Sequence, residues 1–202
     1  MNEALIRVMI LPYLRKNLPS KRLGHVMGVT HLARVLARRH GLDPERATLA
    51  GLLHDAAKCW TAKKLVAYVR RHRVLVPDLE HTIRVQPHLL HAYAGAHFAR
   101  TNFGVRDRTV LSAIAHHTLG SVPMTRFDKC VYVADLAAPD RLFKSAEDLR
   151  KLALRNLDRA FVEAVRIKLN DLIRRGEFIH PEAVRVWNRY VDRIFSCKVG
   201  GG

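Results

Sequence analysis

Apolar residues recur at a spacing of three or four along most of this chain, and no segment shows sustained alternation of apolar and polar residues. After Ser20, for example, Val29, Leu32 and Leu36 share one face of a helix. Ser20 is the expected N-cap of that helix, and Gly41 is its expected stop. The sequence therefore predicts an all-α fold, a single-domain helical bundle of eight or nine helices.

The same spacing and the turn residues predict the other helices. They are expected over residues 3–17 (broken or kinked at Pro12), 43–58, 61–72, 88–103, 106–117, 126–136, 157–175 and 181–195. Residues 73–87 lack clean periodicity and are predicted to form a long loop. We expect residues 1–20 to form an N-terminal helical extension, residues 21–198 the main domain, and residues 199–202 a flexible tail.

The chain is strongly basic: 35 Lys and Arg against 18 Asp and Glu give a formal net charge of +17. Such a charge favours polyanionic ligands, such as nucleotides with several phosphates, RNA or an anionic membrane surface. No usual nucleic-acid module is visible, and the aromatic residues, 7% of the chain, do not interleave with basic ones. The charge therefore leaves only a weak RNA contact open.

No apolar run reaches the roughly 18 residues of a membrane span, so no membrane association is expected. The first residues, 1–4, carry an early acid and no basic region, unlike a signal peptide. Cys59, Cys130 and Cys197 are far apart and odd in number. These features indicate a reduced, cytoplasmic protein.

His54 and Asp55 are adjacent at the end of the apolar stretch 51–53. An imidazole and a carboxylate at this place can turn toward one cation, and the carboxylate can also bridge to a second ion. Four more nitrogen and oxygen donors lie within or at the ends of other helical patterns: His25, His91, His117 and Asp135.

Taken singly, each of these histidines fits a hydrogen-bonded core or surface imidazole, and Asp135 fits a cap or turn carboxylate. Together, six nitrogen and oxygen donors without a cysteine match a mononuclear or dinuclear site for iron, manganese or a similar ion. Calcium would require more oxygen ligands. The set therefore predicts a metal-dependent phosphohydrolase.

The order His25, His54-Asp55, Asp135 resembles that of the HD-domain metal-dependent phosphohydrolase superfamily. The flanking segments resemble one branch of it, the bacterial YqeK-type symmetrical diadenosine tetraphosphate hydrolases. The matching segments are GLLHDAAK (residues 51–58), LHAYAGAHF (90–98), AIAHHTLG (113–120), VYVADLAAPDR (131–141) and IHPEAVRVWN (179–188).

This resemblance implies an HD-type helical fold over residues 21–198, a dinuclear centre of iron or another divalent metal, and symmetrical cleavage of diadenosine tetraphosphate to two ADP by a metal-activated hydroxide. It implies that one ion is bound by His25, His54, Asp55 and Asp135, and the second by His91 and His117 with Asp55 bridging. Asp55, Lys58 and His117 are then the expected catalytic residues. The expected substrate-binding residues are Lys58, His116, Thr118 and Arg141.

The chain departs from the family pattern at a few places. His116 stands where the family often has an aromatic residue, Ser121 where a basic residue is common, and Ala138-Pro139-Asp140 where Glu-Pro-Asn is usual. Two alternatives therefore stay open beside the tetraphosphate hydrolase. One is an HD-type nucleotidase or deoxynucleotide triphosphohydrolase, and the other is a basic RNA- or ribosome-associated protein. The sequence is also compatible with a homodimer.

Overall fold

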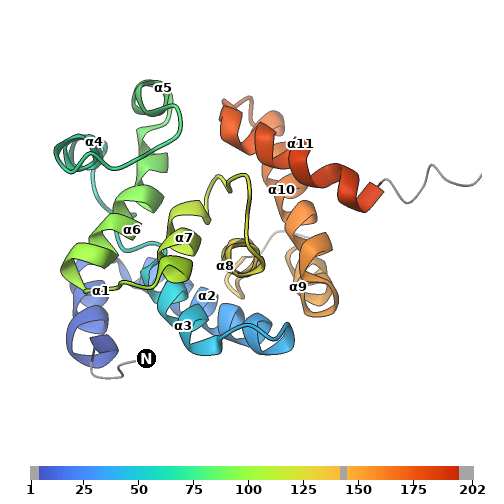
Figure 1. Cartoon of the computed structure of the whole chain (residues 1–202), viewed down its shortest axis with the longest axis horizontal. Helices are drawn as coiled ribbons and strands as arrows, with labels where there is room; N and C mark the ends of the chain where they lie inside the picture. The colour runs from blue at the N-terminus through green and yellow to red at the C-terminus, as the bar shows by residue number, and fades with distance from the viewer. Residues whose placement is uncertain (1–4, 142–144, 196–202) are drawn as a thin grey trace, which may run out of the picture.

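The computed structural model describes residues 5–141 and 145–195, apart from the side chains of residues 7 and 193–195. All regular structure in these residues is helical (Figure 1), which confirms the all-α prediction. The elements are η1 (Leu5–Ile10), α1 (Leu11–Asn17), α2 (Ser20–Arg39), α3 (Pro44–Leu53), α4 (Ala62–Arg71), α5 (Leu79–Val85), η2 (Pro87–Leu89), α6 (Leu90–Asn102), α7 (Arg108–His116), α8 (Arg126–Leu136), α9 (Ala146–Arg155), α10 (Leu157–Arg174) and α11 (Pro181–Phe195).

Short polar side chains begin several helices at the positions that the sequence predicts. The Asp43 carboxylate accepts hydrogen bonds from two backbone N–H groups at the start of α3, and Thr61 accepts one at the start of α4. Thr125 and Asp128 form a reciprocal capping box at the start of α8. These caps satisfy N–H groups that have no partner within the helix, so the helix starts are fixed locally.

Two predicted helix ends are wrong. The N-cap of α2 is Pro19 rather than Ser20, and no side chain caps this helix. The helix expected over residues 43–58 ends at Leu53. It is followed by tighter turns, in which the N–H groups of Ala56 and Lys58 donate to carbonyls only three residues earlier. His54 and Asp55 lie in these turns, directly after the last residue of α3.

Two helices are missing from the sequence prediction, so the described residues hold eleven α-helices rather than eight or nine. The predicted loop 73–87 contains α5, whose seven residues span only about two turns and carry little periodic signal. Helix α9 is rich in charge, and only Ala146, Leu149 and Ala153 mark its buried side. Short or highly charged helices are held by tertiary contacts more than by their own pattern.

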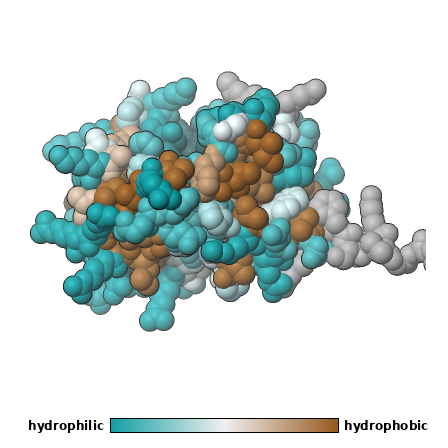
Figure 2. Space-filling view, turned by 90° about the horizontal axis from the view of Figure 1, so that it is seen from above, coloured by the Kyte–Doolittle hydropathy of each residue, from teal (hydrophilic) through white to brown (hydrophobic). Residues whose placement is uncertain are grey.

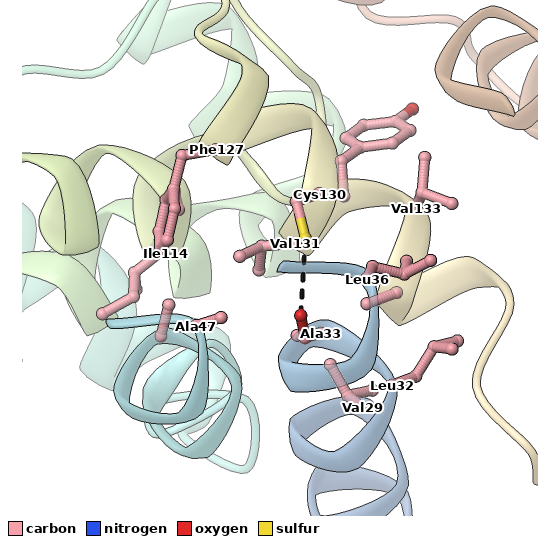
Figure 3. Close-up of a cluster of buried hydrophobic side chains, with 14 of the residues drawn as sticks. Val29, Leu32, Ala33, Leu36, Ala47, Ile114, Phe127, Cys130, Val131 and Val133 are labelled. Carbon is pink, nitrogen blue, oxygen red and sulfur yellow. Dashed lines mark hydrogen bonds between the residues drawn. The ribbon is translucent and has the colours of Figure 1, made fainter. Parts of the chain in front are cut away.

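The main core lies among α2, α3, α7 and α8. Figure 3 shows apolar side chains of these helices meeting there, including Leu36, Ala47, Ile114 and Val131. The Cys130 thiol lies in this core and donates a 3.5 Å hydrogen bond to the Ala33 carbonyl. Burial raises the pKa of Cys130 to about 12, so this thiol is neutral. These four helices also carry or adjoin predicted metal donors, and residues of α1, α9, α10 and α11 belong to the same core.

Gly51 allows the close approach of α2 and α3. A Cβ atom at this position would lie 2.7 Å from the Cα atom of Thr30, a distance that real Cβ contacts do not show. Glycine therefore brings the backbones of these two helices together. This contact sets the turn that holds His54 and Asp55 beside the helix that holds His25.

The N-terminal segment divides where Pro12 predicts a break, since η1 ends at Ile10 and α1 begins at Leu11. Ile10 and Leu14 are fully buried in the main core. The predicted domain boundary near residue 20 stays a prediction, and residues 199–202 lie outside the described residues. None of the described helices combines the length and the apolar character that crossing a membrane requires.

Candidate metal centre

The six predicted donors come together from five separate segments of the chain. His25 is on α2, His54 and Asp55 follow α3, His91 is on α6, His117 follows α7, and Asp135 is on α8. Each residue is between 0% and 8% exposed. Such burial of polar side chains requires partners or a cation to compensate for the loss of water.

Asp55 lies between two groups of donors. Its Oδ2 atom is 3.5 Å from His54 Nε2, and its Oδ1 atom is 3.3 Å from His91 Nε2 and 3.7 Å from His117 Nε2. Possible ligand atoms of His25, His54 and Asp55 all lie within 4.8 Å of one another, as do those of Asp55, His91 and His117. One carboxylate can therefore present one oxygen to each of two ions.

Asp135 joins the first of these groups through His25, whose Nε2 atom is 3.0 Å from Asp135 Oδ1. We call His25, His54, Asp55 and Asp135 the acidic cluster. We call Asp55, His91 and His117 the imidazole cluster.

Backbone carbonyls orient three of the four imidazoles. The Nδ1 atoms of His54, His91 and His117 each lie 2.6–2.7 Å from the carbonyl oxygen of the residue three positions earlier. A carbonyl only accepts, so each Nδ1 must carry the hydrogen and donate it. The lone pair of each neutral ring is then on Nε2, which faces the centre, as is usual for histidine metal ligands.

His25 is oriented by a carboxylate instead. Its Nδ1 atom lies 3.0 Å from both carboxylate oxygens of Asp140, to which it donates. Its Nε2 atom then faces Asp135 Oδ1, and these two acceptor atoms require a shared proton or a cation between them. The sequence indicates Asp140 only as a departure from the family pattern and gives no sign of this contact.

One buried atom tests whether the donor set fits a metal ion. His54 is fully buried, and its Nε2 atom has no hydrogen-bond partner although the Nδ1 atom is satisfied. In addition, the Nε2 atoms of His91 and His117 face each other at 3.2 Å. Buried lone pairs that point at a common space are costly unless a cation attracts them. The residues present therefore fit a divalent transition metal.

Burial and neighbouring charges move the pKa values of the donors in different directions. Burial alone would raise the pKa of Asp55, but the adjacent imidazoles outweigh it and hold that pKa well below the ordinary value. Burial alone would lower the pKa of His54, but the Asp55 and Asp135 carboxylates raise it above the ordinary value. Burial lowers the pKa of His117 to about 4. His117 is thus neutral and able to bind a metal over the physiological pH range.

Three of the four predicted substrate-binding residues lie beside the donors. The Thr118 hydroxyl is 3.0 Å from His117 Nε2, and Lys58 Nζ is 3.5 Å from His91 Nε2. Arg141 Nη2 donates a 2.9 Å hydrogen bond to Asp135 Oδ1. His116, the fourth, has its Nδ1 atom 3.2 Å from the Ser112 hydroxyl. Its predicted contact with substrate stays a prediction.

Sequence reasoning also missed two cations at the centre. Arg22 Nη1 donates a 3.0 Å hydrogen bond to Asp55 Oδ2. Arg22 precedes His25 by three residues on α2, so helical spacing alone could have indicated it. Lys168 on α10 has its Nζ atom 3.9 Å from Asp135 Oδ2 and bonds to the carbonyls of His117 and Thr118. Its partners are about 50 residues away in sequence, so no local signal exists.

A cavity of about 660 Å³ adjoins the centre. Thr118, Arg141 and Lys168 line it where it meets the donors, and its other walls come from η2, α8, α10 and the start of α11. Its volume is typical of pockets for small ligands. In Figure 2, the face seen from above carries apolar side chains toward its middle and hydrophilic side chains around its rim. The arrangement provides space for a ligand next to two partly exposed cations, Arg141 and Lys168.

Comparisons with known proteins agree with this geometry. The HD domain family matches residues 22–140. A protein of Bacillus subtilis (strain 168) named "Bis(5'-nucleosyl)-tetraphosphatase, symmetrical" is 31% identical, over 90% of this chain and 96% of its own length. A protein of the same name from Halalkalibacterium halodurans is 30% identical, over 89% of this chain and 94% of its own.

A solved structure has the same fold. It is that of a predicted HD superfamily hydrolase involved in NAD metabolism from Clostridium acetobutylicum, and it matches with a TM-score of 0.85 and 34% identity. The match covers 91% of this chain and 96% of the other.

Proposed function

The chain belongs to the HD domain family of metal-dependent hydrolases, and on this premise we propose that it cleaves diadenosine tetraphosphate symmetrically into two ADP. The names of its relatives from two bacilli support this substrate, since this chain covers nearly their whole length. A tetraphosphate that joins two nucleosides is also a polyanion, which a chain of charge +17 attracts.

The observation that carries the proposal is the position of Asp55 between two groups of imidazoles. One oxygen faces His54, and the other faces His91 and His117. Dinuclear centres use such a shared carboxylate to hold two ions close together. Paired ions suit phosphoanhydride hydrolysis, because both the attacking and the leaving oxygen carry negative charge.

We propose that His25, His54, Asp55 and Asp135 hold one ion and that His91 and His117 hold the other with Asp55. Bound divalent ions lower the pKa of water toward neutrality and neutralise charge on phosphoryl oxygens.

The chain's own residues complete the site. Lys58 and Arg141 place positive charge beside the donors, where it can bind the phosphates and stabilise charge as it develops. Thr118 offers a hydroxyl donor at the same place. His25 is kept in position by Asp140. The leaving ADP is weakly basic, so the chain does not need a strong general acid.

We propose iron as the resident metal, with manganese as the second choice. A site of imidazoles and carboxylates without thiolates suits both ions. Metal analysis of anaerobically purified protein tests this choice, and zinc as the dominant metal would contradict it.

Hydrolysis by the purified chain tests the proposal directly. With ferrous or manganous ion, we expect ADP as the only nucleotide product from diadenosine tetraphosphate, as measured by chromatography. Asp55→Ala removes the shared ligand and should abolish turnover, whereas Glu147→Gln on the exposed surface of α9 should not change it. Unchanged turnover in Asp55→Ala would contradict the proposed centre.

A panel of nucleotides separates the alternative substrates. Faster hydrolysis of mononucleotides or deoxynucleoside triphosphates than of diadenosine tetraphosphate would favour a nucleotidase or a deoxynucleotide triphosphohydrolase. A cytoplasmic location, a homodimer and a weak RNA contact are the remaining proposals. Fractionation, light scattering and salt-dependent RNA binding test them in turn.

A further inference from the structure

Among the described residues, no acid is hydrogen-bonded to the ammonium of Lys168. Its Nζ atom bonds to the carbonyl oxygens of His117 at 3.2 Å and Thr118 at 3.3 Å, and it lies 3.9 Å from the centre of the Tyr132 ring. The nearest carboxylate oxygen, Asp135 Oδ2, is also 3.9 Å away, beyond hydrogen-bonding distance. An ammonium has three N–H donors. Two of them have carbonyl acceptors, and no oxygen or nitrogen of the described residues accepts the third, so a ligand could accept it.

Lys129 on α8 shows what a structural lysine looks like in this protein. Its side chain is 8% exposed, and its Nζ atom donates a 2.6 Å hydrogen bond to the Asp158 carboxylate. It also lies 4.6 Å from the centre of the Tyr190 ring. Lys129 is thus neutralised by an acid and covered by aromatic rings. Lys168 is more exposed, at 24%, and its charge faces the cavity.

The cavity beside Lys168 has two different ends. Thr118, Arg141 and Lys168 provide a hydroxyl and two cations next to the donors. The remaining walls are mainly apolar, with Leu89, Leu119 and Leu172 among them, and they also carry Arg166, Asp171 and Arg174. A nucleotide has the same division, with anionic phosphates at one end and a flat, weakly polar base at the other. The match indicates that the phosphates of a nucleotide would lie beside the donors and its base would lie against the apolar walls.

We propose that Lys168 is a further substrate-binding residue, whose ammonium binds a phosphate of the nucleotide whose nucleoside occupies this cavity. The inference rests on the proposed function for the identity of the nucleotide. The phosphate accepts the third N–H of Lys168, while the bonds to the carbonyls of His117 and Thr118 remain. The same lysine therefore joins the substrate to the end of α7, where His117 is held.

Binding of the product ADP to the full chain tests this role without relying on turnover. Isothermal titration with ADP, and separately with adenosine, is carried out on native protein and on Lys168→Met with measured metal content. We expect ADP affinity to fall about 10- to 100-fold, since a charge-assisted hydrogen bond is lost. Adenosine affinity should change less than about threefold, because it has no phosphate. Lys63→Met, at an exposed lysine on α4, is the control.

Two further variants keep the test decisive. Lys168→Arg keeps the charge and should restore part of the ADP affinity, even if Lys168→Met does not fold. Leu172→Trp fills the cavity and should weaken both ADP and adenosine. Ile173→Trp, at a neighbouring residue that is 63% exposed and outside the cavity lining, should weaken neither.

Equal ADP affinity in native protein and folded Lys168→Met would overturn the inference, as would Leu172→Trp that binds adenosine normally. The proposed function has a separate readout. Native protein that binds ADP through Lys168 but does not cleave diadenosine tetraphosphate would contradict the reaction and support the binding site. If native protein cleaves diadenosine tetraphosphate while Lys168→Met binds ADP normally, the reaction is supported and the role of Lys168 is contradicted.

Discussion

The acidic cluster and the imidazole cluster share Asp55 but differ in what surrounds them. In the acidic cluster, charged partners already occupy the donors: Arg22 binds Asp55, Arg141 binds Asp135, and Asp140 binds His25. In the imidazole cluster, His91 and His117 face each other, and Lys58 and Thr118 lie beside them. The same residue types can therefore form one half in which charged side chains hold the donors in place and another half in which two imidazoles face each other beside the shared Asp55.

The difference in charged partners affects how tightly the acidic cluster and the imidazole cluster would each hold an ion. Three carboxylates, those of Asp55, Asp135 and Asp140, lie at the acidic cluster together with two guanidinium groups, whereas a single carboxylate oxygen faces His91 and His117. More negative charge gives stronger attraction for a divalent cation in a buried site. We therefore expect the acidic cluster to retain its ion more tightly, and the following experiments test that expectation.

Removing one imidazole from each cluster should have the largest effect. His54→Ala should lower turnover by about 10³-fold or more, because several kcal/mol of charge stabilisation are lost with the ion. His117→Ala should leave the acidic cluster able to bind its ion. Metal analysis after gel filtration should then find about one ion per chain in His117→Ala. Equal metal loss in the two variants would contradict the difference between the clusters.

Asp140→Asn should weaken the acidic cluster alone. The asparagine keeps the size of the side chain but removes the charge that orients His25, and loss of such a partner costs about 10- to 100-fold in metal affinity. Competition with a chelator measures the affinity of each ion. Asp43→Asn, which alters a carboxylate at the cap of α3 away from the donors, is the matched control. An equal loss of both ions in Asp140→Asn would show that the clusters are not independent.

Lowering the pH should weaken the acidic cluster more steeply than the imidazole cluster. The pKa of His54 is raised by Asp55 and Asp135 despite burial, so protons compete with the ion once the pH falls below that pKa. Burial keeps the pKa of His117 at about 4, so protons do not compete there above about pH 5. Below the pKa of His54, the affinity of the acidic cluster should fall by up to about tenfold per pH unit. Equilibrium dialysis at each pH measures the loss, and a steeper loss from the imidazole cluster would contradict the assignment.

The sequence predicts the donors better than their surroundings. Residues such as His25, His54 and Asp135 stand out because a polar side chain on an apolar helix face requires a reason. Arg22 and Lys168 are ordinary basic residues in a chain that has 35 of them, so their contacts with Asp55, His117 and Asp135 depend on how the helices assemble.

Prediction of the helices is limited in the same way, because some of them depend on contacts with distant parts of the chain. Helix α8 is predicted over its full range, since its apolar run is a local signal, and the structure adds the Thr125 cap. Helices α5 and α9 carry weaker local signals and form against the rest of the chain. The turn after Leu53 is also unpredictable from local pattern, because it depends on the contact that Gly51 makes with α2.

The main chain aims three of the four imidazoles, since His54, His91 and His117 each donate to a carbonyl three residues before them. Carbonyls are present whatever the sequence, so side chains elsewhere can change without tilting these rings. The surface residues of such a protein can therefore change greatly, even to a surface as rich in arginine as this one, while the three imidazoles keep their orientation.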